Sequence, residues 1–200
     1  MFGYRFNNLV YVKVPRNGCS TYSHFLESNG WEMINLNYDL DDIADPVFFG
    51  HVTEPNQRHT KGLARYLTLS KQTKLIDDPK VRRLLVSGVF DEHCYSINMM
   101  IPTLVNRVHW IPLDFSWRHF DGDFLTNRFL KQQGVNLPFD TIQRQNVATP
   151  ASRQLYDKIN AAKSEYDSDY QHLVKNFLEL DIKLHVYAVD LYNHTNLDEE

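Results

Sequence analysis

A short basic loop between an apolar run and a helix start is the stretch of this chain best suited to chemistry. The valine- and tyrosine-rich residues 10–14 predict a buried strand, and Pro15 ends it because proline gives a sheet no backbone donor. Gly18 permits a tight turn, after which Ser20 and Thr21 open a helix. Backbone N–H groups at a helix start have no partner within the helix, and the helix dipole favours negative charge there. The pattern therefore predicts a phosphate or sulfate site, unless the segment is only a strand–turn–helix corner without a ligand.

The candidate donors to such an anion belong to the loop and the first helical turn: Arg16, Asn17, Gly18, Cys19, Ser20 and Thr21. This loop lacks the first glycine and the lysine of the nucleotide-binding pattern Gly-x-x-x-x-Gly-Lys-Ser/Thr. The departure argues against an ordinary ATPase, and a kinase-like enzyme with another nucleotide stays as an alternative. Cys19 could be a reactive thiol beside the helix start, but a small residue that fits a tight loop is the simpler interpretation.

The elements that must position this loop alternate between strands and helices. Strands are predicted at residues 4–14, 31–36, 46–52 and 108–112, and helices at residues 21–28, 56–69, 78–89, 124–133 and 150–177. Residues 182–192 fit either a late strand or a closing helix. The alternation predicts an α/β fold with a mostly parallel central sheet flanked by helices. Ligands of such sheets lie beyond the carboxyl ends of the strands, so the loop after the first strand and the turn after the third are expected to share one site.

The composition limits the classes of protein that fit this chain. Its 200 residues suffice for one domain with a substantial core, expected over residues 1–192 with a polar tail at 193–200. A net charge of −4 argues against general nucleic-acid binding, and no apolar run reaches the length of a membrane span. The first residues carry no signal-peptide pattern. We therefore expect a cytoplasmic protein without a membrane partner, with free thiols at Cys19 and Cys94; the oligomeric state stays open.

Residues 14–21, which read Val-Pro-Arg-Asn-Gly-Cys-Ser-Thr, resemble the 5′-phosphosulfate loop of the sulfotransferases. That loop follows a strand and carries Pro-Lys, a few small residues and a Ser/Thr pair. The resemblance implies a P-loop-like sulfotransferase fold and 3′-phosphoadenosine-5′-phosphosulfate as the sulfate donor. Arg16 stands where the family usually has lysine, which keeps the charge but replaces a mobile ammonium by a planar guanidinium.

Residues 52–63 resemble the family's 3′-phosphate motif, which reads Arg-Asp/Glu-Pro, two residues, Arg, two residues and Ser. Glu54 and Arg58 fall in register with it. Thr53 replaces the phosphate-binding arginine, and Lys61 replaces the serine. The resemblance implies that Arg58 and Lys61 lie near the 3′-phosphate, with a single hydroxyl donor at Thr53 in place of a bidentate cation. The simpler roles are a helix-start carboxylate for Glu54 and a structural ion pair for Arg58.

Three later segments extend the resemblance, so that it covers about residues 8–173. Residues 108–112 are similar to a His-Trp-x-Pro segment of Golgi-type carbohydrate sulfotransferases, although Leu113 follows where glutamine is usual. Residues 145–147 and 166–170 are similar to the family's late Asn-Val turn and to a helix that ends in Tyr-x-x-Asp-Phe/Tyr. The partner that this implies is a hydroxyl-bearing acceptor such as a carbohydrate.

Sulfuryl transfer needs a base for the proton of the acceptor hydroxyl, positive charge on the leaving phosphate, and in-line geometry, as phosphoryl transfer does. Histidine suits the base because its ordinary pKa lies near neutrality. His51 lies near the carboxyl end of a predicted strand, and His93 lies in a polar insertion between apolar runs. These two are the candidate bases, with Arg16 as the catalytic cation, whereas His109 is expected to be packed. No spacing of histidines or cysteines matches a metal signature, so no metal is expected.

We therefore predict a sulfotransferase-like protein that transfers a sulfuryl group from this donor to an acceptor hydroxyl. The alternative is a catalytically silent member of the same fold, kept as an interaction or assembly module. The replacements at Thr53 and Lys61 favour that alternative.

Overall fold

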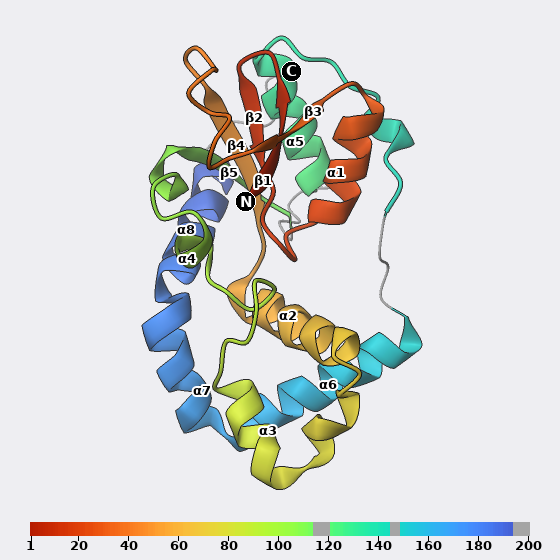
Figure 1. Ribbon diagram of the computed structural model, residues 1–200, viewed down its shortest axis with the longest axis vertical. Coiled ribbons are helices and arrows are strands. Elements are labelled where there is room, and N and C mark those ends of the chain that lie inside the picture. The colour runs from red at the N-terminus through yellow and green to blue at the C-terminus, as the bar shows by residue number, and fades with distance from the viewer. Residues whose placement is uncertain (114–120, 145–148, 194–200) are drawn as a thin grey trace. The chain divides into compact units, whose positions relative to one another are not determined.

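The computed structural model describes residues 1–113, 121–144 and 149–193 (Figure 1). Strands and helices both occur along the chain, so the expected α/β class is confirmed. The chain divides into two compact units. The first comprises Met1–Thr53, Thr103–Asn146 and Leu184–Glu200, and the second comprises Glu54–Pro102 and Val147–Lys183. One boundary between the units falls between Thr53 and Glu54, and the single domain expected over residues 1–192 stays a prediction.

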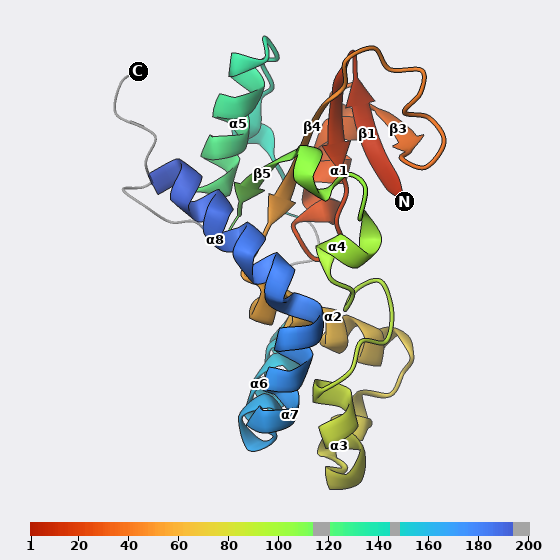
Figure 2. The ribbon, with the colours of Figure 1, turned by 90° about the vertical axis from the view of Figure 1, so that its left-hand side faces the viewer.

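A five-stranded sheet forms the centre of the first unit, with the strand order β3-β1-β2-β4-β5. Figure 2 shows β3, β1, β4 and β5 of this sheet. The strands are β1 (Phe2–Phe6), β2 (Leu9–Val12), β3 (Glu32–Asn35), β4 (Val47–Val52) and β5 (Val108–Pro112). β2 pairs in parallel with β4, and β4 with β5. β1 pairs antiparallel with both β2 and β3. The sheet is therefore mixed, and the expectation of a mostly parallel sheet holds only for the β2-β4-β5 half.

The expected first strand, residues 4–14, is a hairpin of β1 and β2. Asn7 adopts a left-handed φ of 53° at its turn, a conformation that asparagine tolerates better than most residues. Next to this turn, Phe6 of β1 pairs with Leu9 of β2. Apolar and aromatic residues lie on both sides of the turn. Their pattern predicts one continuous strand, although the pair Asn7-Asn8 is also typical of a turn.

Much of the rest of the first unit's core, which also includes Tyr192, comes from two helices. They are α1 (Cys19–Ser28) and α5 (Gly122–Gln132), accompanied by short turns of 3-10 helix, η2 (Val105–Arg107) and η3 (Phe139–Thr141). α1 stops where the sequence predicted, because Asn29 caps it and Gly30 follows with a φ of 82°. The buried cluster joins strand and helix side chains: Tyr11, Phe49, Ile111, Tyr22, Leu26, Leu125 and Leu130.

The second unit is built from helices. Its elements are α2 (Pro55–Leu69), η1 (Thr73–Asp77), α3 (Pro79–Val86), α4 (Ile97–Met100), α6 (Pro150–Glu165), α7 (Asp167–Leu173) and η4 (Val174–Leu178). α2 and α6 lie against each other, and α3 also contacts α6 (Figure 1). Their buried faces share one cluster that includes Leu63, Leu67, Ile76, Val86, Leu155 and Ile159.

The C-terminal helices differ from the expected single helix at residues 150–177. Tyr166 interrupts that helix with a φ of −113° and a ψ of 43°, so α6 and α7 are separate. Residues 182–192, for which a strand and a helix were both open, belong to α8 (Glu179–Asn193). Residues 194–200 of the expected tail lie outside the described residues. Within the described part of the chain, no helix has the length and apolarity needed to span a membrane.

Candidate functional site

The loop between β2 and α1 in the first unit is folded sharply by two residues with positive φ. Arg16 has a φ of 67° and Gly18 a φ of 70°, and between them the Asn17 N–H donates to the Val14 carbonyl over 3.3 Å. Gly18 suits its position because a Cβ there would lie only 2.6 Å from Cδ1 of Leu113. The chain thus reverses within a few residues, and α1 begins at Cys19.

The start of α1 carries donors but no capping acceptor. Gly18 is its N-cap residue, and among the described residues no side chain caps the helix. Its first turn also contains no acidic residue, the residue type that stabilises the positive end of the helix dipole. Cys19 and Ser20 are half-buried and Thr21 is buried. This is the arrangement of a helix N-terminus that can accept an oxyanion.

The side chain of Arg16, like the start of α1, has a hydrogen-bond donor without an acceptor among the described residues. Its Nε is buried and has no hydrogen-bond partner among the described residues. A buried donor without a partner costs about 1 to 3 kcal/mol, and a non-glycine residue at positive φ costs a similar amount. Both costs fall on the same residue, two positions before the N-cap residue Gly18.

Asn17 forms hydrogen bonds inside the protein. Its side chain is fully buried, and its amide Nδ2 donates to the His51 carbonyl over 2.8 Å. The Thr53 hydroxyl donates to Oδ1 of Asn17, also over 2.8 Å. These bonds tie the loop to the carboxyl end of β4, as expected for parallel neighbouring strands. They also commit the Thr53 hydroxyl, which the resemblance had offered as a donor to the 3′-phosphate.

His51 is a core residue of the first unit. Its ring is fully buried, with Nδ1 3.2 Å from Oη of Tyr11 and Nε2 2.9 Å from Oγ1 of Thr126. Burial, helped by the positive charge of Arg144, lowers its pKa to about 3. The imidazole is therefore neutral and both its nitrogens are engaged. This geometry favours a packing role over the general-base role that the sequence indicated.

A polar chain beside His51 was not foreseen from the sequence. The Tyr22 ring lies 3.8 Å from the His51 ring, centroid to centroid, and the Tyr22 hydroxyl donates to the Asp123 carboxylate. Asp123 also pairs with the guanidinium of Arg144. Burial, followed by the charge of Asp123, raises the pKa of Tyr22. The three residues are far apart in the sequence, and no local spacing signal links them.

Arg58, in the second unit, is committed to a structural ion pair. Its side chain is 1% exposed, and Nη2 donates to Oδ2 of Asp181 over 2.6 Å and to the Tyr95 carbonyl over 2.7 Å. Asp181 in turn accepts the Ile97 N–H. The simpler of the two interpretations, an ion pair within the protein, is the one that this geometry supports. Nε and Nη1 of Arg58 are buried without a partner among the described residues. The ion pair with Asp181 nevertheless holds the guanidinium inside the protein, which does not favour contact with a 3′-phosphate.

Glu54 starts α2, as its simpler interpretation predicted. Its carboxylate accepts the Asn56 N–H over 3.0 Å and the Gln57 N–H over 2.7 Å. Two donors of the first turn are thereby satisfied, and the negative charge lies at the favourable end of the helix dipole.

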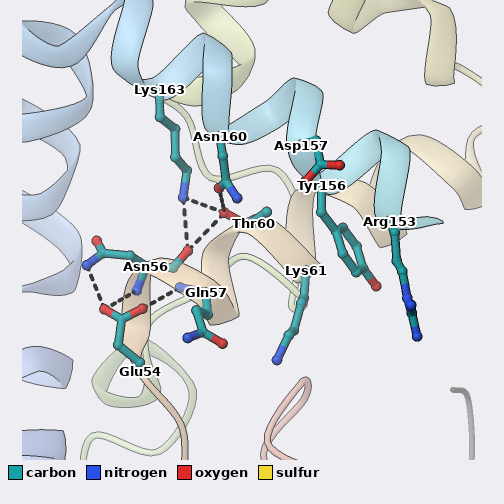
Figure 3. A pocket seen from close by; sticks show the side chains of 10 residues that line it. All are labelled: Glu54, Asn56, Gln57, Thr60, Lys61, Arg153, Tyr156, Asp157, Asn160 and Lys163. Carbon is teal, nitrogen blue, oxygen red and sulfur yellow. Dashed lines mark hydrogen bonds between the residues drawn. The ribbon is translucent and has the colours of Figure 1, made fainter. Parts of the chain in front are cut away.

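Lys61 lines a pocket of about 530 Å³ in the second unit (Figure 3). The walls come from the first turns of α2 and from α6. The lining residues are Glu54, Asn56, Gln57, Thr60, Lys61, Arg153, Tyr156, Asp157, Asn160 and Lys163. Figure 3 shows the side chains of Lys61, Tyr156 and Arg153 extending in the same direction. Of the expected binding residues in this unit, Lys61 lines this pocket and Arg58 does not.

Lys163 links α6 to α2 and α7 by hydrogen bonds at one wall of the pocket. Its side chain is buried, and its ammonium donates to the Asn56 carbonyl over 3.0 Å, to Oγ1 of Thr60 over 2.9 Å and to Oη of Tyr170 over 3.0 Å. No carboxylate among the described residues forms an ion pair with it. Burial therefore lowers its pKa to about 7. The sequence had placed residue 163 only within a long amphipathic helix.

His93, the other candidate base, is half-buried in the second unit. Its Nδ1 lies 3.2 Å from Oδ2 of Asp91, a pairing that orients the imidazole. The backbone of His93 packs closely on α2, because a Cβ at Gly62 would overlap the His93 carbonyl oxygen. His109 is packed as predicted: it stacks on Phe129 and bonds to the Tyr192 hydroxyl at 2.8 Å.

The predicted binding residues therefore fall into two groups. Arg16 to Thr21 belong to the first unit with His51, whereas Arg58, Lys61 and His93 belong to the second. Residues 145–147 of the late motif lie outside the described residues.

The thiols at Cys19 and Cys94 are free, and burial raises the pKa of Cys94 to about 11. In the part of the chain that the structure describes, no three histidines, cysteines or carboxylates are grouped to hold a metal ion. Comparison with models of known protein families, with curated proteins and with solved structures finds no match for this chain.

Proposed function

We propose that this chain is a sulfotransferase-like protein whose β2–α1 loop binds the 5′-phosphosulfate of 3′-phosphoadenosine-5′-phosphosulfate. The observation that carries the proposal is Arg16, a residue at positive φ whose buried Nε has no partner among the described residues. It precedes a helix start that no described side chain caps. Backbone strain and an unsatisfied donor are typical of sites that a ligand completes. An oxyanion would satisfy both the guanidinium and the first-turn N–H groups.

In this proposal each group has one task. The oxygen of the acceptor hydroxyl attacks sulfur, the bond between sulfur and the 5′-phosphate oxygen breaks, and adenosine 3′,5′-bisphosphate leaves. Arg16 and the amides of Gly18 to Ser20 stabilise the negative charge that develops on the leaving phosphate. The proton of the acceptor passes to a base. His51, the candidate base in the same unit as the loop, is enclosed, and we do not assign the base to it.

One observation favours the second candidate function, a catalytically silent module. Two residues of the 3′-phosphate motif are committed inside the protein, since Thr53 donates to Asn17 and Arg58 pairs with Asp181. Lys61 is then the cation of that motif that lines a pocket. A donor bound without those two contacts would lose charge-assisted hydrogen bonds, each worth about 1.5 to 3 kcal/mol.

Calorimetric titration of the full chain with adenosine 3′,5′-bisphosphate tests the proposal. We expect micromolar binding that weakens about tenfold or more in Arg16→Ala, because one charge-assisted bond is lost. The matched control is Arg5→Ala, whose Nε bonds only to the Asn7 carbonyl at the surface of the same unit. Equal weakening in both variants, or the absence of binding, would overturn the proposal in favour of the silent module. Tighter binding of ATP would support the kinase-like alternative instead.

A further inference from the structure

The pocket between α2 and α6 offers charge without a partner. The guanidinium of Arg153 has no hydrogen-bond or ion-pair partner among the described residues, although it lines the pocket beside Tyr156. Arg153 lies four residues before Asp157 on the same helix, yet the two form no ion pair. Figure 3 shows Arg153 and Lys61 extending the same way from the two helices. Two cationic groups are therefore presented together at one side of the pocket.

The remaining lining carries one further cation and two carboxylates. Lys163 also lines the pocket, but its ammonium is buried and donates to Asn56, Thr60 and Tyr170. The carboxylates of the lining are Glu54 and Asp157. One of the carboxylates, Glu54, already accepts three N–H groups at the start of α2. The chain as a whole carries a net charge of −4, so two cationic side chains at one side of a pocket depart from the average charge of the chain. The lining suits an anionic group and not a metal ion or an apolar ligand.

The size and the other lining groups define the rest of the ligand. A volume of about 530 Å³ lies in the range of small-molecule sites and exceeds what a bare sulfate or phosphate needs. Asp157, Asn160 and Gln57 add a carboxylate and two amides, which accept from and donate to hydroxyl groups. Tyr156 adds a ring that can lie against the face of a sugar. These groups fit a polyhydroxylated body attached to the anion.

We propose that this pocket binds a small phosphate or sulfate ester of a polyol, with Lys61 and Arg153 on the ester oxyanion and Asp157 and Asn160 on the hydroxyl groups. The site lies wholly within the second unit. The proposal for this pocket can therefore be tested independently of the donor loop in the first unit.

Titration of the full chain with glucose 6-phosphate, glucose 6-sulfate, inorganic phosphate and glucose tests this site. We expect both esters to bind, with inorganic phosphate and glucose each about tenfold weaker because each makes only part of the contacts. Arg153→Ala should weaken ester binding about tenfold or more. It should fold normally, since its side chain is exposed and makes no described bond. Lys158→Ala is the matched control, because Lys158 is exposed on the same helix and pairs with Asp77 outside the pocket.

Each further outcome decides the matter. Ester binding that is insensitive to Arg153→Ala, or weakened equally by Lys158→Ala, would overturn the site. So would inorganic phosphate that binds as tightly as the esters, or no binding of any probe. Arg16→Ala should leave ester binding unchanged, which separates failure of this site from failure of the donor loop.

Discussion

Arg58 and Asp181 form a buried ion pair, with Nη2 of the arginine 2.6 Å from Oδ2 of the aspartate and both side chains at most 2% exposed. The pair links α2 to the start of α8, and the same carboxylate also accepts the Ile97 N–H at the start of α4. Burial raises the pKa of Asp181, opposed by the Arg58 charge, and lowers the pKa of Arg58. Each charge is tolerated because the other is present.

Removal of one partner should therefore be far more harmful than removal of both. We expect Asp181→Asn to lower the free energy of unfolding by about 3 to 5 kcal/mol, because it leaves a buried guanidinium without its counter-charge. The double variant Arg58→Met with Asp181→Leu should recover much of that loss. Urea denaturation followed by circular dichroism gives the comparison.

Asp190, exposed on the same helix, supplies the control. Asp190→Asn should change the free energy of unfolding by less than about 0.5 kcal/mol. A loss in Asp181→Asn as small as that would contradict the structural role of the pair.

Gly18 should resist substitution for two reasons that can be separated. Gly18→Ala combines a positive φ of 70° with a Cβ 2.6 Å from Leu113, so we expect a loss of more than about 2 kcal/mol in stability and loss of bisphosphate binding. Gly134→Ala has a φ of 77° but no atom within 4 Å of its Cβ. It should cost only the backbone strain of about 1 to 2 kcal/mol and leave binding intact. Thermal unfolding and calorimetry of both variants check this; equal effects would remove the special role of Gly18.

Acid should destabilise the protein through its buried histidines. His51 and His59 have pKa values of about 3 in the folded chain because burial disfavours their charged forms, against about 6.5 when unfolded. The unfolded chain binds more protons between these values, so stability is present above about pH 6.5 and is lost as the pH falls toward 3. The loss reaches about 5 kcal/mol per histidine at the acid end.

His51→Gln isolates one of these contributions, because glutamine is neutral and can still bond to Tyr11 and Thr126. The free energy of unfolding from urea titrations, at several values between about pH 6.5 and 4, should fall less steeply in the variant than in the parent chain. Parallel pH profiles would show that His51 is not held neutral in the fold.

Lys163 should make the free energy of unfolding depend on pH above neutrality. Its folded pKa of about 7 lies well below the ordinary value of 10.5, because the ammonium is buried among Asn56, Thr60 and Tyr170 and the charges of Glu54 and Cys94 only partly offset this. The unfolded chain binds the extra proton between these values, so stability rises with pH in this window. We expect a gain of about 2 to 3 kcal/mol between about pH 7 and 9, below the range in which Cys94 titrates.

Lys163→Met removes the titrating group and should flatten that rise when urea denaturation is measured across the same window. A variant whose stability still rises as steeply would assign the pH dependence to another group.

The sequence predicted the elements that depend on local signals. α1 and α2 begin and end close to the expected residues, since Gly18, Pro55 and the Asn29-Gly30 pair act on their immediate neighbours. The hairpin of β1 and β2 was missed because the apolar pattern does not change across Asn7. The division of the chain into two compact units was not predicted, because it depends on contacts between distant segments.

The parts of the site that depend on local sequence signals were also predicted. The loop from Arg16 to Gly18 is local, and its position at the carboxyl end of β2 follows from strand and helix order. The partners of Arg58 and Tyr22 could not be found from the sequence, since Asp181 and Asp123 lie more than 100 residues away from them. The pocket at Lys61 depends on the packing of α6 against α2, which no spacing encodes.

The most direct test of the donor-loop proposal is a crystal structure of the full chain with adenosine 3′,5′-bisphosphate. We predict the 5′-phosphate at the start of α1, with its oxygens within hydrogen-bond distance of the Arg16 guanidinium and of the main-chain N–H groups of Gly18, Cys19 and Ser20. A bisphosphate bound elsewhere, while this loop keeps its conformation and holds no anion, would contradict the account.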